Sequence, residues 1–89
     1  MITKKIIIIN KLGLHARAAA KFVATASKFC SKLTVTKKNQ CVNGKSIMGV
    51  MMLAASKGTE LEFCFDGEDE HELMTAIDAL INNFFDEKE

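Results

Sequence analysis

The sequence predicts an α+β fold in which helices cover one face of a largely antiparallel sheet. Two observations lead to this prediction. Apolar and polar residues define seven segments in the order β-α-β-β-α-β-α, and the 89 residues include no proline that would break an element. Four strands and three helices in so short a chain leave room for one core, so we expect a single domain over residues 1–89. Periodicity does not settle the strand order.

The first half of the chain contains three predicted strands and one helix. Residues 3–9 combine β-branched residues with a run of isoleucines, which is typical of a central strand. A polar loop then precedes a helix over residues 16–29, where apolar residues recur at helical spacing. Alternating residues predict a strand over residues 32–36. A turn at residues 37–39 returns the chain into a short third strand, residues 40–42.

The second half contains two predicted helices and one strand. Ser46 stands where a helix N-cap is expected, ahead of a short apolar segment that a Lys-Gly pair closes. Residues 60–65 alternate, which predicts a last strand with one buried face. Asp69 with Glu72 has the spacing of a capping box. The final helix then has an apolar stripe made of Leu73, Ala76, Ile77, Leu80, Ile81 and Phe84.

The composition excludes several classes of protein. A chain with 48% hydrophobic and 26% charged residues is not disordered. No apolar run approaches the roughly 20 residues that span a bilayer, and no signal peptide is recognisable, so we expect a cytoplasmic protein without membrane insertion. Cys30, Cys41 and Cys64 are widely spaced and form no CxxC pair, which argues against a disulfide framework or a metal site. We expect no cofactor, and we expect the cysteines to be buried, with Cys64 on the less certain strand face.

The charges are strongly separated along the chain. All eleven acidic residues lie at Glu60 or later, and eleven of the twelve basic residues lie at Lys57 or earlier. The first 59 residues therefore carry a net charge of +11 and the last 30 carry −10, although the whole chain carries +1. Either the fold keeps these charges apart and presents a positive face to an acidic partner, or they share one surface and cancel. Both alternatives stay open at this level.

Residues 13–17, Gly-Leu-His-Ala-Arg, indicate phosphate chemistry. Gly13 allows a sharp turn before the predicted helix, which places His15 at or near the helix N-terminus. Backbone N–H groups and the helix dipole favour an anion there, beside a neutral and nucleophilic imidazole. Arg17, the only arginine, adds forked donors that match phosphate oxygens. A phosphohistidine needs such a nucleophile, a cradle from the backbone of Ala16 and Arg17, and a counter-charge. A solvated capping histidine is the alternative.

Two motifs resemble those of a known family. Residues 13–19, Gly-Leu-His-Ala-Arg-Ala-Ala, resemble the active-site histidine signature of HPr, the phosphocarrier family of the bacterial phosphoenolpyruvate-dependent phosphotransferase system. Residues 45–50, Lys-Ser-Ile-Met-Gly-Val, resemble the regulatory serine site of that family. The likeness covers essentially the whole chain, including the element order and the distance between the motifs. It implies an open-faced β-sandwich, in which three helices cover a four-stranded antiparallel sheet of order 1-4-2-3.

The resemblance also implies a reaction. His15 would accept a phosphoryl group on Nδ1 from phosphorylated enzyme I, originating in phosphoenolpyruvate, and pass it to an EIIA-type protein for sugar uptake or regulation. Arg17 would balance the charge in both transfers, and the protein would be a carrier, not an enzyme. Many members have proline where this chain has Ala18, which leaves one more backbone N–H near the site. We expect a monomer that binds no nucleic acid.

Ser46 and the short helix after it have two interpretations. As an N-cap, the serine stabilises the helix by about 1 kcal/mol. The resemblance implies that an HPr kinase also phosphorylates Ser46, and a helix N-terminus tolerates the charge of that phosphate. The helix after Ser46 is too short to bury every apolar side chain. We therefore expect some of its apolar side chains to remain exposed beside His15 and to form an adaptable docking patch. Core packing is nevertheless expected for Ile47, Val50 and Met51. The predicted docking residues are Lys11, Lys21, Lys45, Ile47, Met48, Met51 and Met52.

Three other functions are the alternatives to the phosphocarrier. A nitrogen-related or purely regulatory HPr paralogue would use the same histidine with other partners. A small nucleic-acid-binding α+β domain would use the basic first two-thirds, but Phe22 and Phe29 lie within or near the apolar helix stripe and no aromatic residue interleaves with the lysines. The cysteine spacing argues against a metal-handling domain. His71, in the acidic start of the last helix, is expected to be a surface residue.

Overall fold

The helices and strands follow the predicted order, and one 3₁₀ turn is added near the C-terminal end. The computed structural model describes residues 1–87. Its elements are β1 (Ile2–Ile7), α1 (Ala16–Ala26), β2 (Lys32–Lys37), β3 (Gln40–Asn43), α2 (Ile47–Met52), β4 (Glu60–Asp66), α3 (Glu70–Asn82) and η1 (Phe84–Asp86). The α+β class predicted from the segment order is therefore confirmed.

The four strands form one antiparallel sheet in the order β1-β4-β2-β3. β4 lies inside this sheet, where Phe63 is paired with Lys4 of β1 and with Val35 of β2. β1 and β3 are the two edge strands. This is the strand order that the family resemblance implied and that periodicity could not supply.

The isoleucine run does not form a central strand, so that prediction is wrong. Ile6 and Ile8 are buried in the core, whereas Ile7 is half exposed. Ile8 lies beyond the end of β1, and its backbone bonds to Gly58 and Thr59 in the loop before β4. The helices bury one side of this edge segment, and an apolar run therefore does not require a neighbouring strand on both sides.

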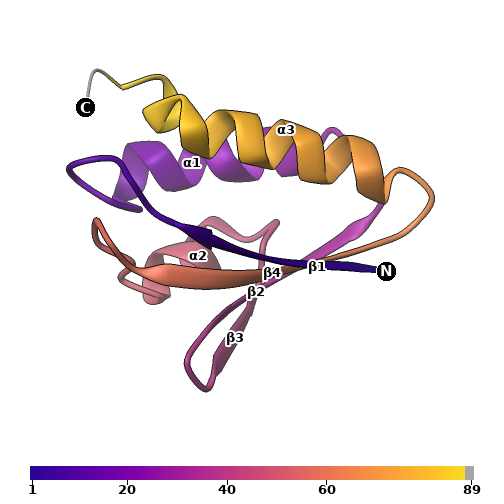
Figure 1. The fold of residues 1–89 in the computed structure, drawn as a ribbon, viewed down its shortest axis with the longest axis horizontal. Coiled ribbons are helices and arrows are strands. Elements are labelled where there is room, and N and C mark those ends of the chain that lie inside the picture. The colour runs from indigo at the N-terminus through magenta and orange to yellow at the C-terminus, as the bar shows by residue number, and fades with distance from the viewer. Residues whose placement is uncertain (88–89) are drawn as a thin grey trace.

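The core lies between the sheet and the two longer helices. Figure 1 shows α1 and α3 side by side over the same face of the sheet, while α2 packs against α1 and β3. Phe22 of α1 contacts Phe63 of β4, with ring centroids 5.9 Å apart, and Phe63 stacks near Phe65 at 6.2 Å. Leu61, Phe63 and Phe65 are all buried, so the predicted one-faced alternation of this strand is confirmed.

The predicted capping box at the start of α3 is wrong. Asp69 is the N-cap by position, but its side chain makes no capping hydrogen bond. Its carboxylate accepts hydrogen bonds from the backbone N–H groups of Cys30 and Ser31, at 2.8 and 2.9 Å, and from the Ser31 hydroxyl. Glu70, not Glu72, bonds back to a backbone N–H ahead of the helix, at 3.2 Å. The Asp69 carboxylate therefore accepts its hydrogen bonds from three donors in the turn after α1, and not from the first N–H groups of α3.

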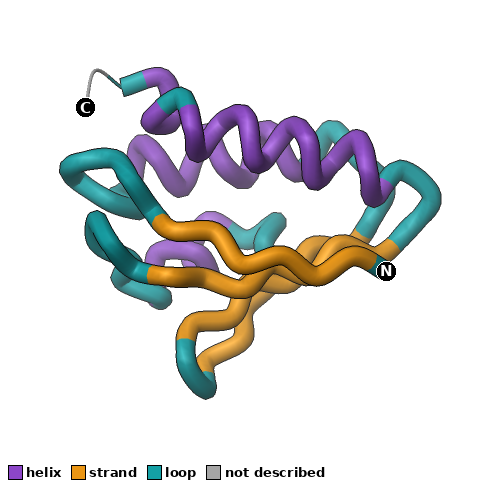
Figure 2. Tube along the Cα trace, in the orientation of Figure 1, coloured by secondary structure: helices purple, strands orange, loops and turns teal. Residues whose placement is uncertain are grey.

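Both longer helices end earlier than predicted. α1 ends before Phe29, and α3 ends before Phe84. A left-handed turn follows α3, because Phe84, Phe85 and Asp86 have φ values of 55°, 53° and 63°. This turn buries Phe85 instead of Phe84. It also brings the chain back to the end of the molecule where the loop before α1 lies, as Figure 2 shows.

The cysteines are not buried as predicted. Cys30 and Cys41 are exposed, and Cys64 is partly buried. The register places Cys41 opposite Thr36 and Cys64 opposite Thr34, on the face of the sheet that points away from the core. A small apolar side chain does not by itself indicate which face of a strand it occupies.

Candidate functional site

The loop that carries His15 is fastened to the loop before β4. Gly13 has a φ of +67°, and a Cβ atom there would lie 2.3 Å from the carbonyl oxygen of Ala55. The backbone N–H of Leu14 donates to that same oxygen at 2.8 Å, and the Leu14 side chain is buried. This close approach requires glycine at position 13, and it fixes the backbone that leads into His15.

His15 is the N-cap of α1, as predicted. Its backbone is extended, with φ −78° and ψ −179°, and its ring Nδ1 accepts a hydrogen bond from the backbone N–H of Arg17 at 3.3 Å. Ala16 and Arg17 begin the helix, where backbone N–H groups have no partner within the helix and attract an anion. The Arg17 side chain is exposed and the first turn contains no acidic residue. The His15 ring, the first backbone N–H groups of α1 and Arg17 thus share one helix end.

Sequence reasoning missed the nearest partner of the His15 ring. Glu87 lies 72 positions away, yet its Oε2 is 2.5 Å from Nε2 of His15. The side chains are 28% and 12% exposed, so the contact is largely shielded from water. No local spacing links these residues, because the left-handed turn after α3 brings them together.

Asn10 is the second missed residue. It is fully buried, and its Nδ2 donates to the carbonyl oxygen of Gly13 and to Oε1 of Glu87, both at 2.9 Å. Desolvation raises the pKa of Glu87, but the hydrogen bonds from Asn10 and His15 outweigh it, so this pKa lies below its usual value. Glu87 is therefore a carboxylate near neutral pH and accepts hydrogen bonds at both oxygens.

These partners determine which ring nitrogen of His15 carries the proton. A carboxylate only accepts, so Nε2 is the donor toward Glu87. Nδ1 accepts from the Arg17 N–H and therefore has a lone pair. The ring nitrogen with a free lone pair is thus Nδ1, on the side of the ring that faces the start of α1.

The predicted docking lysines are placed differently from one another. Lys11 is exposed in the loop before α1. The amine of Lys21 donates to the carbonyl oxygen of Phe85 at 3.1 Å and lies 3.8 Å from Asp86. The amine of Lys45 donates to the carbonyl oxygen of Phe29 at 2.6 Å. Lys21 and Lys45 thus hold the backbone of other segments, a structural role that the sequence did not reveal.

The short helix α2 presents most of its apolar side chains to solvent. Met48 and Met52 are strongly exposed, as is Leu12 in the loop that carries His15. Ile47 and Met51 are 44% and 41% exposed, so the expectation of core packing is wrong for these two and confirmed only for Val50. A helix of six residues turns one narrow stripe toward the sheet, and its other side chains face outward.

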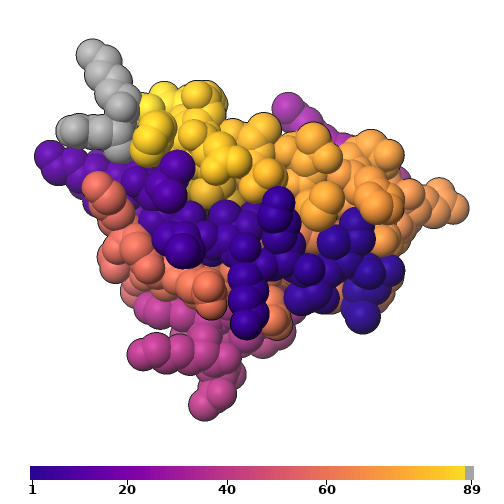
Figure 3. All heavy atoms as spheres, viewed as in Figure 1, coloured from indigo at the N-terminus to yellow at the C-terminus, as the bar shows by residue number. Residues whose placement is uncertain are grey.

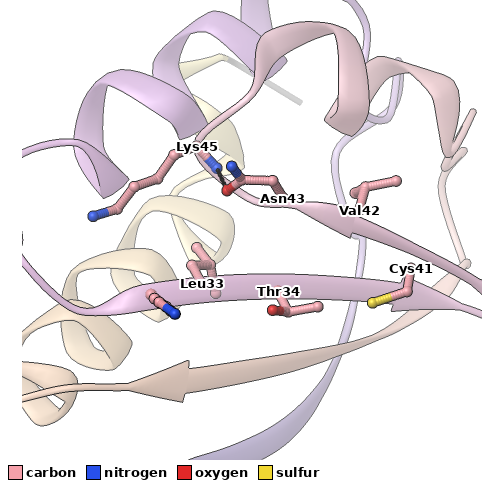
Figure 4. Close-up of a pocket in the computed structure, with 7 residues that line it drawn as sticks. Leu33, Thr34, Cys41, Val42, Asn43 and Lys45 are labelled. Atoms are coloured by element: carbon pink, nitrogen blue, oxygen red, sulfur yellow. Dashed lines mark hydrogen bonds between the residues drawn. The ribbon is translucent and has the colours of Figure 1, made fainter.

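Ser46 is the N-cap of α2, as predicted. Its hydroxyl oxygen accepts a hydrogen bond from the backbone N–H of Gly49 at 3.1 Å. A groove of about 420 Å³ is lined by residues up to Lys45, the neighbour of Ser46 in the chain. Figure 4 shows its lining residues, among which Asn43 accepts a hydrogen bond from the backbone N–H of Lys45 at 2.9 Å. The residues that line this groove belong to β2, β3 and the segment before Ser46, and none of them belongs to the His15 site.

The charges that are separate in sequence mix in space. Lys4 forms an ion pair with Asp78 of α3 at 3.3 Å, and Lys5 is paired across the strands with Glu62. Within residues 1–87, no group of three or more histidine, cysteine or acidic side chains is placed to hold a metal ion. No helix in the same range is long and apolar enough to cross a bilayer.

Comparison with known proteins decides the family. The model for PTS-HPr, described as the PTS HPr component phosphorylation site, matches residues 2–83. This chain belongs to the HPr family. It is 60% identical to phosphocarrier protein HPr of Neisseria meningitidis over 89 residues, covering all of both chains. It is 55% identical to that of Xylella fastidiosa, covering 98% of each chain.

Solved HPr structures have the same fold. The chain superposes on HPr of Thermoanaerobacter tengcongensis with a TM-score of 0.95 at 48% identity, covering all of both chains. HPr of Bacillus anthracis gives 0.86 at 36% identity, covering 90% of this chain and 95% of that one. The family resemblance and the open-faced β-sandwich are thus confirmed. As an HPr-family member, the protein is a phosphocarrier of the phosphotransferase system and not a catalyst.

Proposed function

We propose that His15 is the residue that carries the phosphoryl group. It accepts this group on Nδ1 from phosphorylated enzyme I, which takes it from phosphoenolpyruvate, and passes it to an EIIA-type protein. The observation that carries the proposal is the placement of Nδ1, which has a lone pair and lies beside the first N–H groups of α1. An imidazole nitrogen with a lone pair can attack phosphorus, and a helix start favours the resulting charge.

Arg17 and the backbone stabilise the transferred group in this proposal. The N–H groups of Ala16 and Arg17 cradle the phosphoryl oxygens, and the guanidinium balances their charge during arrival and departure. The exposed Arg17 side chain is accessible to a partner-bound phosphoryl group. Arg17 is thus the counter-charge and His15 the nucleophile.

The docking face lies around this helix start and α2. The exposed side chains of Met48 and Met52 supply apolar area, with Ile47 and Met51 at its inner side. Lys11, Lys21 and Lys45 supply positive charge for acidic partner surfaces. The protein works as a cytoplasmic monomer, with one domain over residues 1–89, in sugar uptake or its regulation, and binds no nucleic acid.

Ser46 is a regulatory phosphorylation site in the same proposal, for an HPr kinase. Its hydroxyl lies at the start of α2, directly before the exposed residues Ile47 and Met48. A phosphate there adds about −1.5 to −2 charges within the docking face without requiring the helix to unfold.

The test is phosphorylation in a defined mixture. The protein is incubated with phosphoenolpyruvate and enzyme I, and its intact mass is measured at neutral pH. We expect one added phosphoryl group that acid removes, because a phosphoramidate is acid-labile. His15→Ala abolishes the addition, and His71→Ala, which changes an exposed histidine of α3, leaves it intact. Labelling that persists in the His15 variant would refute the assignment.

A further inference from the structure

We propose that Glu87 is a positioning residue, held by Asn10, that keeps the proton of the His15 ring on Nε2 and so leaves the Nδ1 lone pair for the phosphoryl group. The consequence for transfer rests on the proposed function of His15. The location of the ring proton does not, and it can be measured in the protein alone.

The hydrogen bonds form a chain with a defined direction. Nδ2 of Asn10 donates to Oε1 of Glu87 at 2.9 Å, and Oε2 of Glu87 accepts from Nε2 of His15 at 2.5 Å. The ring then accepts at Nδ1 from the Arg17 N–H. Every link is satisfied with one arrangement of protons, because the carboxylate has no proton to donate.

Asn10 cannot reverse this direction. Its Nδ2 also donates to the carbonyl oxygen of Gly13 at 2.9 Å, and that oxygen can only accept. Rotating the amide would set its oxygen against two acceptors, Gly13 and Glu87. Because Asn10 is fully buried, water cannot compensate for such a reversal.

The chain segment that carries Glu87 is itself held in place. Phe85 is fully buried, and its carbonyl oxygen accepts from the amine of Lys21 at 3.1 Å. Lys21 also lies 3.8 Å from Asp86. Figure 3 shows the yellow C-terminal residues directly against the dark segment that precedes α1. The turn that places Glu87 next to His15 is therefore itself packed against the rest of the protein.

The carboxylate also compensates the charge that transfer creates. The Nδ1 lone pair forms the bond to phosphorus while the bond between phosphorus and the donor atom of enzyme I breaks, and its electron pair stays on that atom. Nε2 keeps its proton throughout, so the phosphorylated ring is cationic at the moment of transfer. Glu87, beside that proton, stabilises this cation, and the same holds when the group leaves for the acceptor.

Glu87→Gln tests the proposal most sharply, because it keeps the shape of the side chain and changes the direction of one bond. Since Asn10 must donate, the glutamine oxygen faces Asn10 and its NH₂ group faces Nε2. Nε2 must then accept, and the ring proton moves to Nδ1. Nitrogen-15 NMR of the ring at mildly alkaline pH reports this directly, with the proton on Nε2 in the wild type and on Nδ1 in Glu87→Gln.

We expect the same variant to reduce kcat/KM for transfer from enzyme I by at least about tenfold, since a wrong histidine tautomer is very costly in Ser-His-Asp triads. Glu87→Ala removes the acceptor without imposing a tautomer, so it loses less than Glu87→Gln. Glu72→Gln is the matched control, because it makes the same change at an exposed glutamate of α3 that does not contact His15 or the turn that carries Glu87. It leaves the ring spectrum and the transfer rate unchanged.

Two outcomes separate this proposal from the proposed function. If Glu87→Gln keeps its proton on Nε2 and transfers at the wild-type rate, the positioning role is refuted while His15 labelling stands. If the wild type is not labelled on His15 but the proton still moves in Glu87→Gln, the proposed function fails and the positioning of the ring by Glu87 is supported.

Discussion

Asp69 accepts a hydrogen bond from the backbone N–H of Ser31 at 2.9 Å, which joins the start of α3 to the turn after α1. The Ser31 hydroxyl and the Cys30 N–H donate to the same carboxylate. Behind Ser31 lies Gly67, where a Cβ atom would come within 2.5 Å of the Ser31 oxygen. These contacts join the turn after α1 to the loop before α3.

The Asp69 carboxylate makes stability depend on pH. The Ser31 hydroxyl first, and then the Cys30 N–H, lower the pKa of Asp69 below 3.8 in the folded state. Because the folded-state pKa is the lower one, the stabilisation is complete above 3.8 and disappears as the pH falls through the folded-state pKa. We expect Asp69→Asn to lower the melting temperature at pH 7. The difference from the wild type should shrink in strong acid, and thermal melts over an acid series measure it.

Ala54 occupies a conformation that glycine tolerates better. Its φ is +49°, directly after α2, and its side chain is exposed. An L-residue in the left-handed conformation is destabilised by roughly 1–2 kcal/mol. Glycine avoids this strain, but part of the gain is lost because glycine loses more conformational entropy when the chain folds. We expect Ala54→Gly to raise the free energy of unfolding by about 0.5–1 kcal/mol in urea titrations. Ala20→Gly, at an exposed position inside α1, should lower the free energy of unfolding by about 1 kcal/mol. If both substitutions changed this free energy in the same direction, the left-handed conformation of Ala54 would not explain its effect.

Phe84 and Phe85 distinguish the left-handed turn from a continued helix. Phe85 is fully buried, whereas Phe84 is only partly buried. We expect Phe85→Ala to lower the free energy of unfolding by about 3–5 kcal/mol, and Phe84→Ala to lower it clearly less. Denaturant unfolding of the two variants gives the comparison. The reverse ranking would mean that α3 continues through Phe84.

Arg17 should affect transfer more than folding. Arg17→Lys keeps the positive charge and loses the planar fork that matches phosphate oxygens. Since the side chain is exposed, we expect an unchanged melting temperature and a slower phosphoryl transfer from enzyme I. Quenched time courses with labelled phosphoenolpyruvate measure the rate of phosphoryl transfer from enzyme I to each protein. Equal rates in both proteins would show that a point charge suffices.

Ser46→Asp should imitate the proposed regulatory phosphate. The negative charge at the start of α2 suits the helix, so we expect stability to be unchanged or slightly higher. Attraction for an acidic partner falls, so the apparent KM for enzyme I rises, and high salt reduces the difference because exposed charges are screened beyond about 8–10 Å. Transfer that is unaffected at low salt would place Ser46 outside the docking face and leave it only its capping bond to Gly49.

The sequence predicted what local patterns determine. The alternation of Phe63 and Phe65, the capping role of Ser46 and the placement of His15 at a helix start all depend on near neighbours. Asp69 looked like part of a capping box because no local pattern reports the competing donors of Ser31. Glu87 could not be found at all, since only the tertiary fold brings it to His15.

The start of β1 and the end of α3 lie at opposite ends of the molecule, as Figure 1 shows, and an added peptide would disturb different contacts on the two sides. The terminal ammonium of Met1 is exposed and forms an ion pair with Glu70 at 3.1 Å, at a distance from His15. A purification tag or dye attached there perturbs one surface contact. The same group attached after residue 89 begins two positions beyond the carboxylate that holds the His15 ring. Fusions and surface immobilisation are therefore best made through the N-terminus.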